Sequence, residues 1–153
     1  MSTGRPRRPG FKPYEGLRAI VVDDDADVRR LVRHILGLEG ANVDEAHTVD
    51  ELFRLLENGE KPDVVMLDLT MPGASGWTAL PRLRSGGDDV PVVIMTGYND
   101  AEFRASAKAR GAAAYVTKPF TALEVTSAVD VAIGRESRRD PWTGQSGGVD
   151  RSR

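Results

Sequence analysis

The sequence contains no cysteine, which excludes a disulfide framework, thiol catalysis and a thiolate metal site. It also lacks any apolar run near the ~18 residues that a membrane-spanning helix requires. The opening stretch, MSTGRPRRPGFKPYEG, has no apolar centre of the kind found in signal peptides. We therefore expect a cytoplasmic protein without a membrane partner, and 153 residues suffice for one domain with a hydrophobic core.

Neither sign of charge dominates, since the net charge is −2, but the charges are unevenly distributed. Residues 1–15 carry four basic residues against one acidic residue, and residues 135–153 carry five arginines against three acidic residues. A basic end can be a nucleic-acid-binding arm. Neither end shows a helical pattern or interleaved aromatics, so we interpret both as solvated tails. We expect a disordered tail over 1–15, one domain over 16–134, a flexible tail over 135–153, and no direct nucleic-acid binding.

Two kinds of segment alternate between residues 17 and 133. Five short segments are rich in valine and isoleucine: LRAIVVD, ANVDEA, DVVMLD, VPVVIMT and AAYVTK. Those at 17–23, 63–68 and 90–96 are nearly continuous apolar runs, which is typical of central strands buried on both faces. Apolar residues between the segments recur at helical spacing. The pattern predicts an α/β fold, a doubly wound five-stranded parallel sheet with helices on both faces.

Polar residues that carry chemistry stand at the carboxyl ends of the predicted strands, where such sheets bind ligands. Asp23 and Asp24 follow the first strand, Asp68 ends the third, Thr96 the fourth and Lys118 the fifth. Like charges ~4 Å apart repel by about 4 kcal/mol at an effective dielectric near 20, so a cation would stabilise the carboxylates. Taken alone, the triplet DDD could equally be a helix cap with a solvated first turn.

The chemistry of this set favours phosphoryl transfer. Carboxylate and carbonyl oxygens are the ligands that Mg²⁺ prefers. Asp68 follows the apolar run VVML, so it leaves the strand at a fixed position and is a candidate nucleophile. The hydroxyl of Thr96 and the ammonium of Lys118 suit an arriving phosphoryl oxyanion. Arg29 and Arg30 we assign to a solvated helix face.

The segments VVDDD, VVMLDLTMPGASG, VVIMTG and AAAYVTKPF, in this order, resemble the receiver domain of two-component response regulators. The resemblance covers about residues 17–133 and implies a (βα)5 flavodoxin-like fold. It implies that Asp68 accepts a phosphoryl group from the phosphohistidine of a sensor histidine kinase or a histidine phosphotransfer protein. It also implies a signalling protein that catalyses only its own phosphorylation and dephosphorylation.

The resemblance assigns a role to each residue of the set. Asp24 would bind Mg²⁺ directly, Asp23 largely through water, and the backbone carbonyl of Thr70 would be a further ligand beside Asp68. Thr96 would hydrogen-bond the phosphoryl group and Lys118 would pair with it. Tyr115 would be the aromatic switch residue that moves inward when Thr96 shifts, and Pro119 would follow Lys118 through a cis peptide bond.

Three departures from the family pattern carry expectations of their own. Thr70 stands where the family often has asparagine or a longer polar residue, and Tyr98 lies two residues after Thr96, where its ring could cover the phosphorylation site. We expect both to modulate dephosphorylation, with Tyr98 shielding the acyl phosphate from water. Pro81 falls inside the third predicted helix and should kink or delay it.

Two alternatives stay open. A Mg²⁺-dependent phosphohydrolase would also use Asp68 as nucleophile, although the haloacid-dehalogenase pattern wants a second aspartate where Thr70 stands. The chain could also be a receiver fragment of a longer regulator with an output domain. About twenty residues follow residue 133, so we expect output by contact with a downstream protein, and a weak homodimer through residues 98–134.

Overall fold

The computed structural model describes residues 10–59, 61–71, 76–85, 89–98 and 100–135. The strands are β1 (Arg18–Val22), β2 (Asn42–Ala46), β3 (Val64–Asp68), β4 (Val92–Thr96) and β5 (Ala114–Thr117). The helices are α1 (Ala26–Leu38), α2 (Val49–Asn58), α3 (Gly76–Ser85), α4 (Ala101–Ala109) and α5 (Ala122–Ala132). Strand and helix alternate along the chain, as the sequence predicts.

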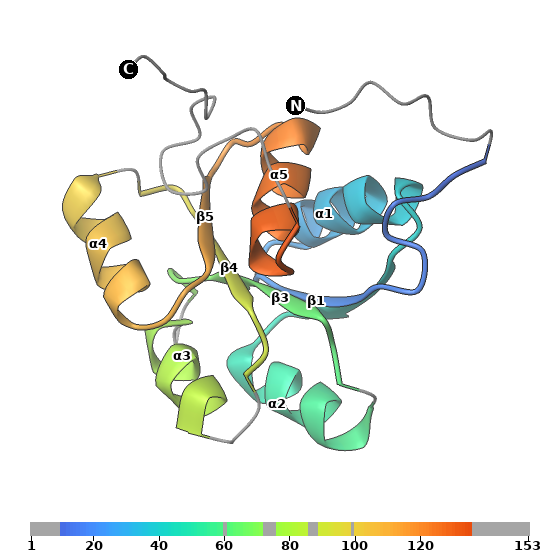
Figure 1. Ribbon diagram of the computed structural model, residues 1–153. Coiled ribbons are helices and arrows are strands. Elements are labelled where there is room, and N and C mark those ends of the chain that lie inside the picture. The colour runs from blue at the N-terminus through green and yellow to red at the C-terminus, as the bar shows by residue number, and fades with distance from the viewer. Residues whose placement is uncertain (1–9, 60, 72–75, 86–88, 99, 136–153) are drawn as a thin grey trace, which may run out of the picture.

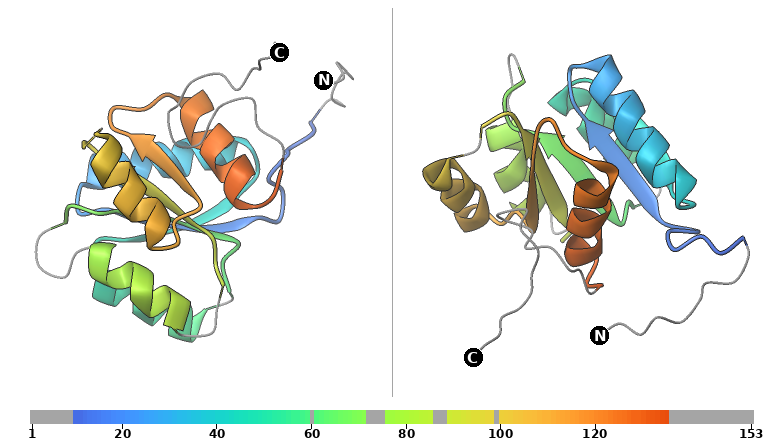
Figure 2. Two further views of the ribbon diagram at one scale, coloured as in Figure 1. Left: turned by 60° about the vertical axis from the view of Figure 1, so that its left-hand side comes forward. Right: turned by 90° about the horizontal axis from the view of Figure 1, so that it is seen from above.

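The strands form one parallel sheet in the order β2-β1-β3-β4-β5. Figures 1 and 2 show α1 and α5 together on one face of the sheet, with α2 and α3 on the other. This arrangement confirms the doubly wound five-stranded α/β fold. The order in which strands are added reverses at β1: β2 lies on one side of β1, and β3, β4 and β5 follow on the other. Such sheets bind ligands at this switch point, between β1 and β3.

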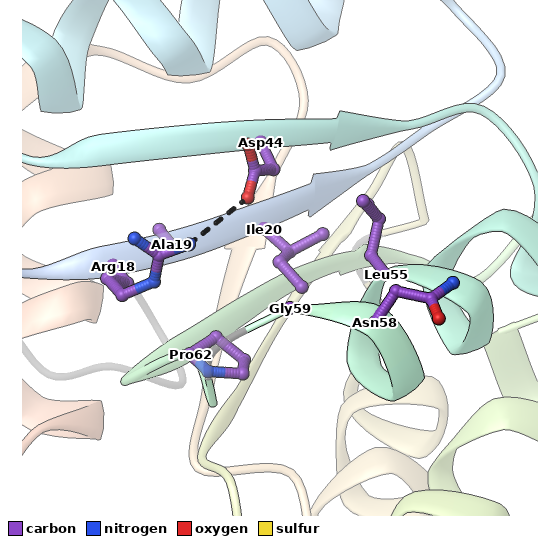
Figure 3. A pocket seen from close by; sticks show the side chains of 8 residues that line it. All are labelled: Arg18, Ala19, Ile20, Asp44, Leu55, Asn58, Gly59 and Pro62. Atoms are coloured by element: carbon purple, nitrogen blue, oxygen red, sulfur yellow. Dashed lines mark ion pairs between the residues drawn. The ribbon is translucent and has the colours of Figure 1, made fainter.

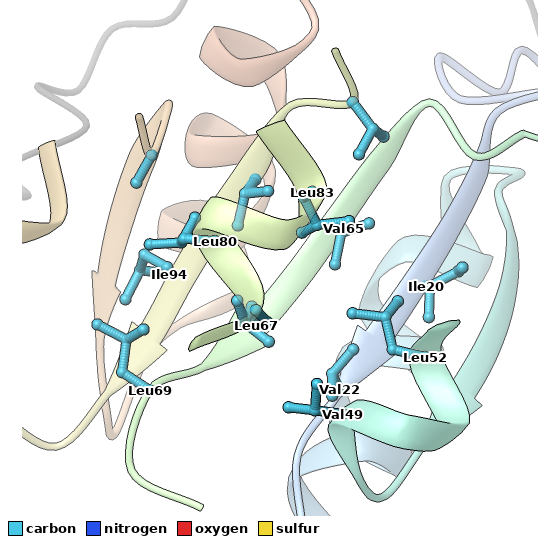
Figure 4. Packing of buried hydrophobic residues seen from close by; sticks show 14 of the residues in the cluster. Ile20, Val22, Val49, Leu52, Val65, Leu67, Leu69, Leu80, Leu83 and Ile94 are labelled. Atoms are coloured by element: carbon cyan, nitrogen blue, oxygen red, sulfur yellow. The ribbon is translucent and has the colours of Figure 1, made fainter. Parts of the chain in front are cut away.

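Each face of the sheet has its own hydrophobic core, because alternate side chains of a strand point to opposite faces. On one face Ile20, Val65 and Ile94 pack with Leu52 of α2 and Leu80 of α3 (Figure 4). The opposite face buries its own strand residues under α1 and α5. Every residue of β3 and β4 is buried, which accounts for their continuous apolar runs and fixes the positions of the residues that end them.

The helix starts are set by capping side chains. Asp25 caps α1, Thr48 caps α2, Asp100 caps α4, and Thr121 forms a capping box with Glu124 at α5. Each cap accepts a hydrogen bond from a backbone N–H that the helix itself leaves unpaired.

Helix α3 continues through Pro81 from Gly76 to Ser85. A Cβ atom at Gly76 would lie 2.5 Å from the carbonyl oxygen of Asp68 and 2.9 Å from the Cα of Leu69. Glycine therefore allows the first turn of α3 to lie directly against the end of β3. This close approach helps to position Asp68.

The interpretation of residues 1–15 as a disordered tail differs from the structure over residues 10–15. Tyr14 is buried, and its hydroxyl donates to Oδ1 of Asp130 (2.6 Å) and lies 2.9 Å from the carbonyl oxygen of Thr126, both on α5. Its N–H donates to the carbonyl of Glu39 after α1 (2.7 Å). The segment thus joins the ends of α1 and α5. Residues 1–9 and 136–153, the remainder of both predicted tails, lie outside the described residues.

Across the described parts of the chain, none of the helices has the length and apolar character needed to traverse a membrane.

Candidate functional site

The predicted site residues meet at one edge of the sheet. Asp23 follows β1, Asp68 ends β3, Thr96 ends β4 and Lys118 follows β5. The carboxyl ends of parallel strands lie at the same edge. Asp23, Asp24 and Asp68 each bring one carboxylate oxygen within 4.8 Å of the other two. This is the arrangement expected from the sequence.

Most of the site residues are buried, and one side of the site is exposed. Asp23 and Thr96 have no solvent-exposed surface and Asp68 is 2% exposed, whereas Asp24 is exposed. Two carboxylates taken out of water are stable only with a compensating cation and hydrogen bonds. The exposed carboxylate of Asp24 marks the side from which a ligand can enter.

Lys118 supplies a cation to both buried carboxylates. Its Nζ lies 2.6 Å from Oδ2 of Asp23 and 3.4 Å from Oδ2 of Asp68. Burial raises the pKa of Asp23, while the hydrogen bond from Lys118 opposes that shift. Burial lowers the pKa of Lys118, but the hydrogen bond and charge of Asp23 outweigh it and the pKa is raised. Lys118 is therefore a fixed ammonium that faces Asp68.

The carboxylate of Asp68 is oriented from both sides. Its Oδ1 accepts hydrogen bonds from the backbone N–H and the hydroxyl of Thr70, at 3.0 and 2.9 Å. Its Oδ2 faces Lys118. Thr70 thus contacts Asp68 through donors, and the role of its carbonyl as a metal ligand stays a prediction.

Two hydrogen bonds connect Thr96 to Tyr115 through the backbone of Tyr98. The Thr96 hydroxyl accepts from the backbone N–H of Tyr98 (3.2 Å), and the Tyr115 hydroxyl donates to the carbonyl of Tyr98 (2.8 Å). Tyr115 is buried, and burial raises its pKa to about 12. Tyr98 as a residue is 55% exposed, and its ring stacks on Phe103 of α4 with centroids 5.0 Å apart.

The backbone after β5 has the cis peptide bond that was expected before Pro119. The Lys118 N–H donates to the carbonyl of Thr96 (2.7 Å), which ties the two strand ends together. Pro119 follows Lys118 through a cis peptide bond.

The prediction that Arg29 lies on a solvated helix face is wrong. Arg29 does not lie on a solvated face: its Nη1 donates to the carbonyl of Asp23 (2.7 Å) and its Nε to Glu45 of β2 (3.0 Å). The Arg29 side chain is 16% exposed, whereas that of Arg30 is 70% exposed and lies 3.4 Å from the carboxylate of Asp27. The position of Arg29 one turn after the helix cap Asp25 places its guanidinium near the preceding loop, but no sequence pattern identifies Glu45 as its partner.

A separate hollow of about 130 Å³ lies at the opposite edge of the sheet (Figure 3). It is lined mainly by aliphatic groups between β1 and the end of α2, and Arg18 and Asp44 form an ion pair beside it at 3.7 Å. Among the described residues, the cluster of Asp23, Asp24 and Asp68 is the group of acidic or histidine side chains arranged to hold a metal ion. The candidate functional site is therefore the acidic cluster at the carboxyl ends of the strands, not this hollow.

Residues 19–130 match the family model of the response regulator receiver domain. The chain therefore belongs to this family, whose members are signalling domains of two-component systems. The fold and the acidic edge described above are those of this class.

Particular relatives extend this assignment. The chain is 36% identical over 130 residues to the response regulator MprA of Mycolicibacterium vanbaalenii, covering 85% of this chain and 55% of that protein. It is 32% identical over 124 residues to MprA of Mycobacterium avium, covering 81% of this chain and 54% of that protein. The chain thus spans about half the length of the curated relatives it matches.

Solved structures agree with the sequence relatives. A response regulator receiver protein from Burkholderia phymatum has a TM-score of 0.70 at 36% identity, over 79% of this chain and 98% of that chain. The receiver domain of NtrX from Brucella abortus has a TM-score of 0.71 at 30% identity, over 77% of this chain and 99% of that chain.

Proposed function

We propose that Asp68 accepts a phosphoryl group from the phosphohistidine of a sensor histidine kinase or a histidine phosphotransfer protein. In this step an Asp68 carboxylate oxygen attacks phosphorus, the P–N bond to histidine breaks, and an acyl phosphate forms. The observation that carries the proposal is the placement of Asp68: it ends a fully buried strand, with Lys118 beside one oxygen and Thr70 donating to the other. Its attacking group is therefore held in place before the donor arrives.

The residues at the edge fit Mg²⁺. Asp23, Asp24 and Asp68 offer three carboxylate oxygens within 4.8 Å of one another, and Mg²⁺ binds one or two protein carboxylates together with phosphate oxygens and waters. We propose that Asp24 and Asp68 bind the ion directly, Asp23 largely through water, and the carbonyl of Thr70 as a further ligand. When bound, Mg²⁺ would neutralise charge that develops on the transferred phosphoryl group.

The remaining groups act on the phosphoryl oxygens. The Lys118 ammonium, already facing Asp68, pairs with one oxygen. The Thr96 hydroxyl, buried at the end of β4, can turn its proton toward another. We also propose that Thr70 and Tyr98 modulate hydrolysis of the acyl phosphate. The Thr70 hydroxyl is engaged by Asp68, and shielding by Tyr98 requires its ring to leave the stack on Phe103.

We further propose that the phosphorylated domain signals by contact with a downstream protein. Residues 98–134, from α4 to α5, are the proposed contact surface, and a weak homodimer through the same surface is part of this proposal. A phosphohydrolase acting on external substrates is disfavoured, because the second aspartate it needs is replaced by Thr70, whose side chain donates to Asp68.

Incubation with acetyl phosphate or a phosphorylated kinase, followed by measurement of incorporated phosphate, tests the assignment. We expect Asp68→Asn to abolish labelling, and chelation of Mg²⁺ to do the same in the wild type. Asp27→Asn is the matched control, because the Asp27 side chain is 88% exposed and lies outside the site. Labelling of Asp68→Asn at the wild-type level would overturn the proposal.

A further inference from the structure

We infer that Arg29 is a positioning residue for the metal-binding carboxylates, because its guanidinium fixes the peptide group between Asp23 and Asp24 against β2. The inference rests on the proposed function, in which Asp23 and Asp24 hold Mg²⁺.

Every polar group of Asp23 is held by a different partner. Its N–H donates to the carbonyl of Ala46 (3.1 Å), and its Oδ1 accepts from the N–H of Asp25 (2.9 Å). Its Oδ2 accepts from Lys118 (2.6 Å), and its carbonyl accepts from Nη1 of Arg29 (2.7 Å). The bond from Arg29 fixes the peptide plane that leads into Asp24. The orientation of that plane sets the direction in which the exposed Asp24 carboxylate points.

Arg29 is itself anchored at the neighbouring strand. Its Nε donates to Oε1 of Glu45 (3.0 Å), while Oε2 of Glu45 accepts from Arg33 (3.1 Å). Glu45 pairs with Val21 in the register of β1 and β2, so it stands beside the strand that leads into Asp23. The guanidinium therefore bridges β2 and the loop after β1 with two donors in fixed geometry, which lysine cannot reproduce.

Arg33 provides an internal control for Arg29, because both arginines bind Glu45. Both donate to Glu45, but the Arg33 side chain is 62% exposed and the Arg29 side chain 16%. Of the two, Arg29 carries the bond to the Asp23 carbonyl. Loss of Arg33 removes one charge and one ion pair, whereas loss of Arg29 also releases the loop. Groups that orient metal ligands in this way typically change metal affinity by 10–100-fold when removed.

Isothermal titration with Mg²⁺ alone, on the whole chain, separates these roles. We expect Arg29→Gln to weaken Mg²⁺ binding about tenfold or more, and Arg33→Gln to leave it near the wild-type value. Arg29→Lys, which keeps the charge but not the two-donor geometry, should recover only part of the loss. In ¹H–¹⁵N spectra of the metal-free proteins, the Asp24 amide resonance should move in both Arg29 variants and stay in Arg33→Gln.

Three results would overturn the inference: unchanged affinity in Arg29→Gln, an equal loss in Arg33→Gln, or full recovery in Arg29→Lys. The last two would assign the effect to charge alone. The variant Asp24→Asn distinguishes a failure of the Arg29 inference from a failure of the proposed metal site. If Asp24→Asn weakens Mg²⁺ binding and Arg29→Gln does not, only the positioning role is lost. If the wild type does not bind Mg²⁺, the proposed metal site itself is wrong.

Discussion

At the scale of single residues, the site depends on one ammonium shared by two buried carboxylates. Lys118 contacts Asp23 at 2.6 Å and Asp68 at 3.4 Å, and its side chain is 23% exposed. Removing one partner of a buried pair leaves a charge without compensation, which is more destabilising than replacing both partners. Lys118 is therefore expected to contribute to folding, in addition to the phosphoryl binding proposed for it.

This reasoning gives a pH-dependent expectation for Lys118→Met in the absence of Mg²⁺. Burial raises the pKa of Asp23 above its ordinary value, and loss of Lys118 removes the hydrogen bond that opposes the shift. The folded variant then binds this proton more tightly than the unfolded chain. Its stability is thus highest in acid and falls as pH rises from the ordinary pKa of Asp23 through the raised one.

Urea unfolding at pH 5 and pH 7.5 measures the effect. We expect a deficit of about 2 kcal/mol at pH 7.5, smaller than for a fully buried pair because Lys118 is partly exposed, and a still smaller deficit at pH 5. The double variant Asp23→Asn, Lys118→Met should lose most of this pH dependence. An equal deficit of the single variant at both pH values would contradict the explanation.

At the scale of elements, the strands and the residues that end them were predictable, and two long-range anchors were not. Continuous apolar runs predict β3 and β4, and parallel strands bring Asp68 and Thr96 to one edge. Tyr14, by contrast, binds Asp130 at a separation of 116 residues, and Arg29 binds Glu45 across 16 residues. Local patterns report periodicity and caps, but they carry no information on partners that only the fold brings together.

The N-terminal segment is therefore expected to stabilise the domain. Tyr14→Phe keeps the buried ring but leaves Oδ1 of Asp130 without its hydroxyl donor, which should lower the free energy of unfolding by about 1–2 kcal/mol in urea titrations. Phe11→Leu, at a residue 53% exposed, should change it by no more than about 0.5 kcal/mol. Because Tyr14 packs against the end of α1 remote from the site, Mg²⁺ affinity should not change. Equal stability of Tyr14→Phe and the wild type would mean that the segment is not an integral part of the domain.

At the scale of the whole molecule, an aromatic cluster links the loop that follows Thr96 to α3, α4 and β5. Phe103 contacts the ring of Tyr98 at 5.0 Å, that of Trp77 at 5.0 Å and that of Tyr115 at 6.3 Å, measured between centroids. The cluster joins α3, α4, β5 and the loop after β4. A displacement of that loop would therefore repack the contacts of α4 with α3 and β5.

Under the proposed function, phosphorylation would supply such a displacement through Thr96. In the structure its hydroxyl accepts from the N–H of Tyr98, whose carbonyl accepts from Tyr115. If Asp68 carries a phosphoryl group as proposed, this group would draw the Thr96 hydroxyl toward the site and weaken its bond to Tyr98. This interaction exists in only one of the two states, which is the condition for a ligand to shift a conformational equilibrium.

Hydrogen exchange with and without the phosphate mimic beryllofluoride tests this coupling. We expect altered protection within residues 98–134, because the loop, α4 and β5 share Tyr98, Phe103 and Tyr115. Thr96→Ala should bind the mimic and lose most of the distant change, since the hydroxyl that responds to the phosphoryl group is gone. Tyr115→Phe keeps the ring in the cluster but cannot donate to Tyr98. It should therefore reduce the change in protection in β5 and leave the change in protection near Thr96 unaltered. Changes confined to α1 and α2 would show that the signal leaves the site by another path.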